Sequence, residues 1–133
     1  MAKTAYESQN IFNISEAHLY RCQVLHYSAR VSRLYISVMK EASTTPVFYL
    51  LFSDVGYMDC PMNWQGADFA IGTQDECIQL MLDTGLIGQA ILRFPNAYAS
   101  LTEYARLYTV KTATHTIRLI ASAANMVTQL PEF

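Results

Sequence analysis

The sequence predicts an α+β fold: a mostly antiparallel β-sheet with one main helix, at about residues 74–84, packed on it. Three observations lead to this class. Short segments rich in Val, Ile, Tyr and Phe, which favour strands, occur along most of the chain. One segment carries both the start and the stop signals of a helix. The chain has 133 residues and contains no linker or internal repeat, so we expect a single domain over residues 1–133.

The main helix is predicted from its two ends. Thr73 followed by Glu76 forms a capping-box pattern, and Asp75 adds negative charge to the first turn, where the helix dipole favours it. Gly85 occupies the position at which a left-handed residue commonly ends a helix. The apolar stripe between these signals consists of Cys77, Ile78, Leu80, Met81 and Leu82.

Residues 17–40 fit two interpretations. Apolar residues recur at alternating spacings of four and three, as on one face of a helix. The composition, however, is rich in Val, Ile, Tyr and Ser, and residues 33–38 alternate as in a strand. We expect two strands with a bend near residues 28–30, although that bend lacks the usual turn residues. The alternative is one long N-terminal helix over residues 17–40.

Further strands and one helical turn are predicted from local composition. Residues 47–52 are apolar on both faces, which is typical of a central buried strand. Ser100 and Glu103 repeat the capping-box spacing, so a short helical turn is expected to start at Ser100. The other predicted strands are residues 67–71, 90–94, 106–112 and 116–122, and residues 60–66 are predicted as a loop.

The composition predicts a covered apolar surface. Hydrophobic residues make up 52% of the chain and charged residues 15%, which is apolar for a soluble protein of this length. Either the core is unusually complete, or a partner covers apolar surface. A second copy of the chain is the simplest such partner, so we expect a homodimer, with an unidentified protein partner as the other case.

Charges are segregated along the sequence. Residues 17–40 carry a net charge of +4, whereas residues 41–100 carry −6. We expect these charges to neutralise each other within the fold, across a symmetric interface or on an external partner. The predicted interaction face on the basic segment is formed by Arg21, Arg30 and Arg33.

The segment from Asp54 to Asp68 is the best candidate for a ligand site. It combines carboxylates, glycines and the single tryptophan, an arrangement that offers hydrogen-bond acceptors and a stacking platform. The commoner meaning of such residues is structural: the aspartates shape turns, and Trp64 packs on the sheet. The candidate ligand-binding residues are Asp54, Tyr57, Asp59, Trp64 and Asp68.

No metal site or cofactor is predicted. His18, Cys22 and His26 are spaced by four, but on a strand or a helix the three together are too far apart to share one ion. Three widely spaced cysteines indicate reduced thiols, and residues 1–13 lack the apolar region of a signal peptide, so we expect a cytoplasmic protein. The longest apolar run, residues 47–52, is too short to span a bilayer.

The sequence therefore predicts a non-enzymatic interaction or assembly module, with no catalytic residue assigned. No nucleotide-binding, hydrolase or metalloprotease motif occurs in it. One alternative is a small-ligand binder or enzyme that uses the Asp54–Asp68 loop. Another is weak nucleic-acid binding through the basic face of residues 21–40, against which the isoelectric point near 5.8 argues.

Overall fold

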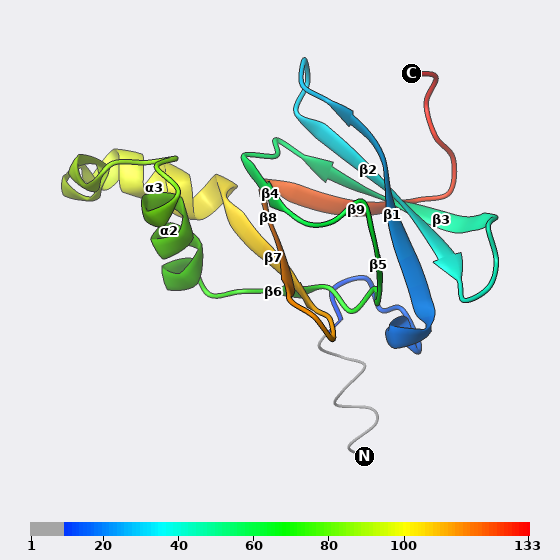
Figure 1. Cartoon of the computed structure of the whole chain (residues 1–133). Helices are drawn as coiled ribbons and strands as arrows, with labels where there is room; N and C mark the ends of the chain where they lie inside the picture. Colours follow the sequence, from blue (N-terminus) through cyan, green and yellow to red (C-terminus); the bar gives the residue numbers. More distant parts are fainter. Residues whose placement is uncertain (1–9) are drawn as a thin grey trace.

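The fold contains two antiparallel sheets that face each other, with helices at one end (Figure 1). The computed structural model describes residues 10–133. The prediction that residues 1–13 lack a signal peptide falls mostly on residues 1–9, which lie outside this range. The first sheet has the order β5 (Asn63–Gln65), β1 (Tyr20–Ser28), β2 (Arg33–Lys40), β3 (Pro46–Ser53) and β9 (Ala123–Val127). The second has the order β4 (Tyr57–Asp59), β8 (Thr116–Ala121), β7 (Arg106–Lys111) and β6 (Ala70–Ile71).

Within residues 10–133 the two sheets are accompanied by four helical segments. They are the 3-10 helices η1 (Ala17–Leu19) and η2 (Gln89–Arg93) and the α-helices α2 (Gln74–Asp83) and α3 (Pro95–Tyr104). The predicted α+β class is confirmed, although the strands form two sheets rather than one and α3 equals α2 in length. No helix within residues 10–133 is long and apolar enough to cross a membrane.

The N-terminal segment forms a hairpin, so the alternative of one long helix over residues 17–40 is wrong. Strands β1 and β2 pair antiparallel, with Cys22 opposite Val38. The turn between the strands contains Ser32 in the left-handed region (φ 52°). The sequence does not predict this left-handed residue, because it has no Gly or Asn there. A β-bulge between Val24 and His26 shifts the alternation by one residue. That shift places Val24 and Tyr27 opposite Ile36 and Leu34, which explains one of the helix-like spacings of three.

The core lies between the two sheets. Phe52 of β3 packs edge-on to Tyr108 of β7, with ring centroids 5.3 Å apart, and also contacts Phe69, at 5.5 Å. These aromatic contacts join the inner faces of both sheets. The other fully buried large side chains of the core are Leu34, Ile36, Val38, Leu50, Val110, Ile117 and Leu119.

Strand β3 confirms the prediction of a buried strand over residues 47–52. It lies inside the first sheet between β2 and β9, and Leu50 and Phe52 are fully buried. Val47 is exposed and Tyr49 and Leu51 are half-buried, so the outer face of the strand is only partly covered. The predicted strands at residues 106–112 and 116–122 are confirmed as β7 and β8.

Strands β8 and β9 are almost continuous, yet they belong to different sheets. Ser122 is the one residue between them, and its backbone N–H donates to the carbonyl of Ser53, at 2.9 Å. Its hydroxyl also donates to the Asp54 carboxylate, at 2.6 Å. The chain thus crosses from one sheet to the other within one residue, which ties the two sheets together at this corner.

Helix α2 is confirmed with both of its predicted ends. The Thr73 hydroxyl accepts from the backbone N–H of Glu76, and the Glu76 carboxylate accepts from the backbone N–H of Thr73. At the other end Gly85 has φ 77°, and the N–H of Leu86 donates to the carbonyl of Met81, as in a Schellman motif. The helix packs through Cys77, Leu80 and Met81 on Leu107 and Ile120, on the outer face of the second sheet.

Other predicted elements are corrected. Residues 90–94 are not a strand: they lie in η2 and the approach to α3, which begins at Pro95, five residues before the predicted turn. Of the predicted strand at residues 67–71, only Ala70 and Ile71 pair with β7. The predicted loop at residues 60–66 contains β5, which pairs with β1.

Candidate functional site

The residues of the predicted ligand loop are distributed over both sheets. Asp54 lies exposed in the turn after β3, with φ 52°, and its carboxylate binds the Ser122 hydroxyl. Tyr57 and Asp59 belong to β4 in the second sheet, and Trp64 belongs to β5 in the first. Asp68 is exposed between β5 and β6.

Trp64 is a core residue rather than a surface platform. Its side chain is 6% exposed and packs edge-on against Phe69, with ring centroids 6.4 Å apart. The indole N–H donates to the carbonyl of Gly66, at 2.8 Å, so the buried polar atom has its partner. A ligand on the surface therefore has no access to this ring, and the structural interpretation of Trp64 accounts for its position.

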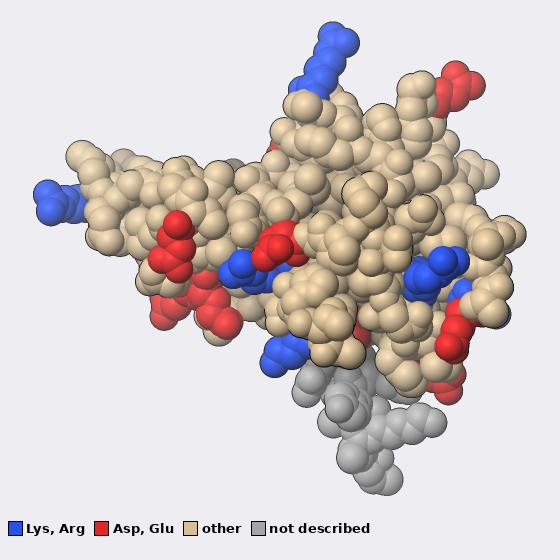
Figure 2. All heavy atoms as spheres, in the orientation of Figure 1, with Lys and Arg blue, Asp and Glu red and all other residues tan. Residues whose placement is uncertain are grey.

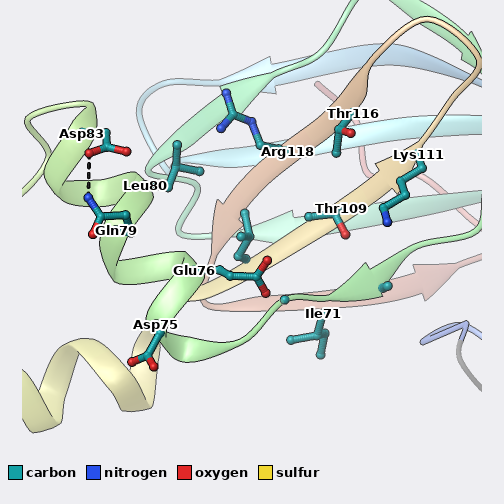
Figure 3. Close-up of a pocket in the computed structure, with 13 residues that line it drawn as sticks. Ile71, Asp75, Glu76, Gln79, Leu80, Asp83, Thr109, Lys111, Thr116 and Arg118 are labelled. Carbon is teal, nitrogen blue, oxygen red and sulfur yellow. Dashed lines mark hydrogen bonds between the residues drawn. The ribbon is translucent and has the colours of Figure 1, made fainter.

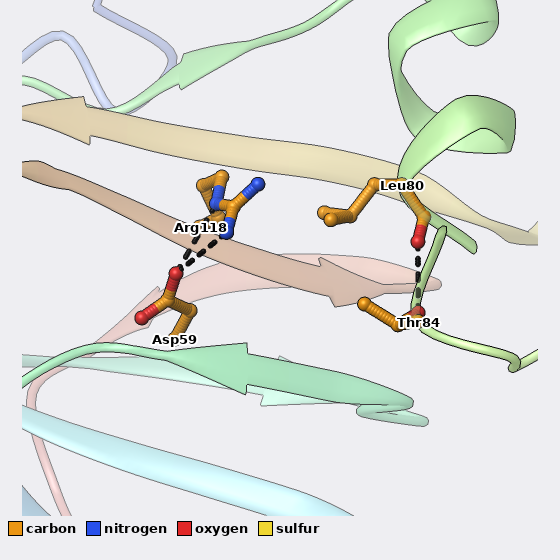
Figure 4. A network of polar contacts seen from close by, with 4 residues as sticks. All are labelled: Asp59, Leu80, Thr84 and Arg118. Atoms are coloured by element: carbon orange, nitrogen blue, oxygen red, sulfur yellow. Dashed lines mark hydrogen bonds and ion pairs between the residues drawn. The ribbon is translucent and has the colours of Figure 1, made fainter. Parts of the chain in front are cut away.

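Asp59 makes the ion pair that joins β4 to its neighbour (Figure 4). Its carboxylate lies 2.7 Å from the Arg118 guanidinium, opposite it in the β4–β8 register. The hydrogen bond to Asp59 raises the pKa of Arg118. The Tyr57 ring lies beneath the same guanidinium, 5.9 Å from ring centre to Cζ. Both ion-pair partners are well exposed, so the pair contributes little to stability but orients Arg118.

Next to Arg118 a groove of about 830 Å³ lies between α2 and the outer face of the second sheet (Figure 3). Helix α2 covers the apolar half of this face and leaves the polar half open. Acidic side chains line the helix wall, whereas Lys111 and Arg118 line the sheet wall. The acidic residues of the helix wall are Asp75, Glu76 and Asp83.

Most charges of the groove are already engaged in the fold. Glu76 closes the capping box, and this hydrogen bonding, first with the Thr73 backbone, lowers the pKa of its carboxyl, with Lys111 adding to the effect. Asp83 accepts from the Gln79 amide, at 2.8 Å. Arg118 is held by Asp59. These hydrogen bonds and the ion pair hold the groups in local structure.

The cysteines are protonated at neutral pH. Burial raises the pKa of Cys22 to about 12 and also raises the pKa values of Cys60 and Cys77. The thiolate is the nucleophilic form, so these environments disfavour a catalytic cysteine. Within residues 10–133 no group of three or more His, Cys, Asp or Glu side chains is placed to hold a metal ion.

The predicted basic face does not form one stripe. Arg21 lies at one end of the β1–β2 hairpin, where it donates to the carbonyl of Ser43, at 2.8 Å. Arg30 and Arg33 lie at the other end, about 20 Å away along the strands. The ion pair of Asp59 and Arg118 is the only one among the described residues, so the basic and acidic segments are not joined by ion pairs in this part of the chain.

The second candidate surface is the helical arm, which we define as residues 86–104 and which contains η2 and α3. It extends away from the sandwich in Figure 1, beyond α2. No residue of these two helices, which lie wholly in the described part of the chain, is buried. The exposed large apolar side chains of the arm are Leu86, Leu92, Phe94 and Tyr104. Sequence reasoning missed this surface because the apolar residues at 90–94 suggested a strand.

One side of α3 faces the rest of the molecule. Leu101 and Ala105 pack against the apolar cluster beneath α2, and Thr102 lines the small space between the two helices. The arm contains only two charged residues, Arg93 and Glu103, near opposite ends of α3. On the face shown in Figure 2, most of the surface is uncharged, and the charged side chains lie in a few separate groups.

Comparisons with protein-family models, with curated proteins and with solved structures find no match to this chain.

Proposed function

We propose that this protein is a non-enzymatic interaction and assembly module that associates with copies of itself through the helical arm. One observation carries the proposal: ten consecutive residues form α3 without burying a single side chain. Phe94, which precedes this helix, and Tyr104, its last residue, are each 62% exposed. An apolar surface of this kind on a small protein is typical of an interaction site.

The stability of an isolated short helix supports the proposal. Helices of fewer than about 12–15 residues are marginal in water unless tertiary packing holds them. Helix α3 has ten residues, and its packing within the chain is limited to half-buried contacts such as those of Leu101 and Ala105. A partner that covers the exposed side of the arm would provide the missing packing.

The chemistry of the remaining surface supports a non-enzymatic role. The groove beside α2 uses Glu76, Asp83 and Arg118 to hold local structure. The described cysteines have raised pKa values, which suppress the nucleophilic thiolate. The arm offers apolar and aromatic side chains, the type that is enriched at the centres of protein interfaces.

Sedimentation velocity over a range of micromolar concentrations tests the proposal. We expect the wild-type chain to self-associate and the double variant Phe94→Ser/Tyr104→Ser to sediment as a monomer. Met62→Ser is the matched control, because Met62 is 65% exposed and lies outside the arm. A wild-type chain that stays monomeric throughout, or an arm variant that associates as strongly as the control, would contradict the proposal.

A further inference from the structure

The side of α3 that faces away from α2 has a definite composition. Leu101, Thr102 and Ala105 point toward the rest of the molecule. At 100° per residue, the opposite side is then formed by small and polar residues. These residues are Asn96, Ala99, Ser100 and Glu103, and all four are exposed.

The middle of this side is small, and large side chains lie at the two ends of the helix. Ala99 and Ser100 lie at the centre of α3, where short side chains let a second helix come close. Phe94 precedes the first turn, and Tyr104 ends the last. A second α3 running antiparallel would place its Tyr104 beside Phe94 of the first copy. The same contact would recur at the other end, because a two-fold axis repeats each contact.

The charges of the arm select the antiparallel arrangement. Arg93 lies before the N-terminus of α3, and Glu103 lies in its last turn. In an antiparallel pair, Arg93 of each copy approaches Glu103 of the other, and Asn96 lies near the same carboxylate. In a parallel pair, like charges would meet at both ends, and the helix dipoles would align unfavourably. Arg106 already donates to the Glu103 and Ser122 carbonyls, so it does not replace Arg93 as a bridge to a second copy.

The exposed area fits a reversible dimer. The four exposed apolar side chains of the arm leave on the order of 400 Å² of apolar surface in water. This is roughly half of what each partner buries in a standard interface, and the small residues of α3 supply further contact. An interface of this size and low charge corresponds to a dimer that dissociates at low concentration.

We infer that two copies of this chain form a two-fold dimer in which the α3 helices pack antiparallel, with Arg93 of each copy against Glu103 of the other. This inference rests on the proposed function, since it specifies the partner and the geometry at the same arm. The dimer closes on itself, so no larger assembly follows from this contact.

Charge reversal tests the geometry. We expect Arg93→Glu or Glu103→Arg to raise the dimer dissociation constant on the order of tenfold, since each reversal creates two like-charge contacts per dimer. The double variant Arg93→Glu/Glu103→Arg should restore the constant to within about threefold of the wild type. Arg30→Glu, on the hairpin away from the arm, is the control for a change of net charge.

Mixing provides a second measurement. A copy with Arg93→Glu and a copy with Glu103→Arg complement each other at both ends, so an equimolar mixture should form heterodimers more strongly than either variant self-associates. Failure of this complementation, while Phe94→Ser/Tyr104→Ser still dissociates the dimer, would overturn the antiparallel geometry and leave the proposed function standing. If Phe94→Ser/Tyr104→Ser leaves the dimer intact, the proposed function itself fails.

Discussion

The β-sandwich and the helical arm use apolar residues in opposite ways. In the sandwich, Phe52, Phe69 and Tyr108 meet between two sheets and lose almost all contact with water. In the arm, Phe94 and Tyr104 retain more than half of their exposure. Both regions are apolar in sequence, yet only the first has neighbours on every side. The first therefore holds the fold together, and the second is available for an interaction.

The two regions also differ in how their short elements are stabilised. The edge strands β4, β5 and β6 have only two or three residues, but each pairs with a longer strand that is anchored in the core. Helix α3 has ten residues and no such anchor, because its contacts with α2 involve half-buried side chains. The stability of an element thus depends less on its own length than on how deeply the elements next to it are buried.

The largest effect on stability is expected from removing an aromatic ring of the core. Phe52→Ala should lower the free energy of unfolding by about 3–5 kcal/mol, because it deletes contacts to both sheets and leaves a cavity. Leu92→Ala in the arm should change it by less than about 0.5 kcal/mol under conditions where the chain is monomeric. Urea unfolding followed by Trp64 fluorescence measures both. Equal losses for the two variants would contradict the division into a stabilising body and a free arm.

An intermediate effect is expected where the arm begins. Gly85 has φ 77°, and a Cβ at this position meets no neighbour, so the cost of Gly85→Ala comes from backbone conformation alone. We expect a loss of about 1–2 kcal/mol in unfolding free energy. Gly88→Ala is the matched control, because Gly88 also has open space around it but lies in the extended region. If Gly88→Ala lowers the free energy of unfolding as much as Gly85→Ala does, the Schellman motif is unimportant here.

The smallest effect concerns the start of α2. The folded pKa of Glu76 is lowered, chiefly by its hydrogen bond to the Thr73 backbone, so the unfolded chain binds the proton more tightly. Its contribution is therefore complete above the unfolded pKa and is lost as the pH falls through the folded pKa. Glu76→Gln should be less stable than the wild type at neutral pH, and the difference should shrink in acid. Urea unfolding of both proteins from neutral pH to about pH 3 measures this difference. A stability difference that grows in acid would contradict a lowered pKa of Glu76 in the folded state.

Elements specified by neighbouring residues were predictable. Thr73, Glu76 and Gly85 define α2 through contacts that span a few residues, and both ends lie where the sequence predicts them. The hairpin of β1 and β2 was predicted less directly, because the bulge near His26 imitates a helical spacing. Local hydrogen bonding is visible in a sequence, whereas the displacement of one residue in a strand is visible only once its partner is known.

Features that depend on distant partners were not predictable. Strand β9 exists because β3 offers it an edge, and the segment carries no strand signal strong enough to predict it. Arg118 became a site residue only through its pairing with Asp59. The arm is a further example, because the sequence of residues 90–94 does not show that the fold leaves them without a covering neighbour.

The crossing of the chain at Ser122 bears on the order in which the protein is made. Strand β3 is synthesised about 70 residues before its outer neighbour β9, so Tyr49 has no pairing partner until Val127 has been synthesised. Strand β8, the centre of the second sheet with β7, is equally late. The two sheets therefore close together only after the residues up to β9 have been synthesised. Folding of this kind, dominated by contacts between distant residues, is expected to take milliseconds to seconds and to be completed only once β9 has been synthesised.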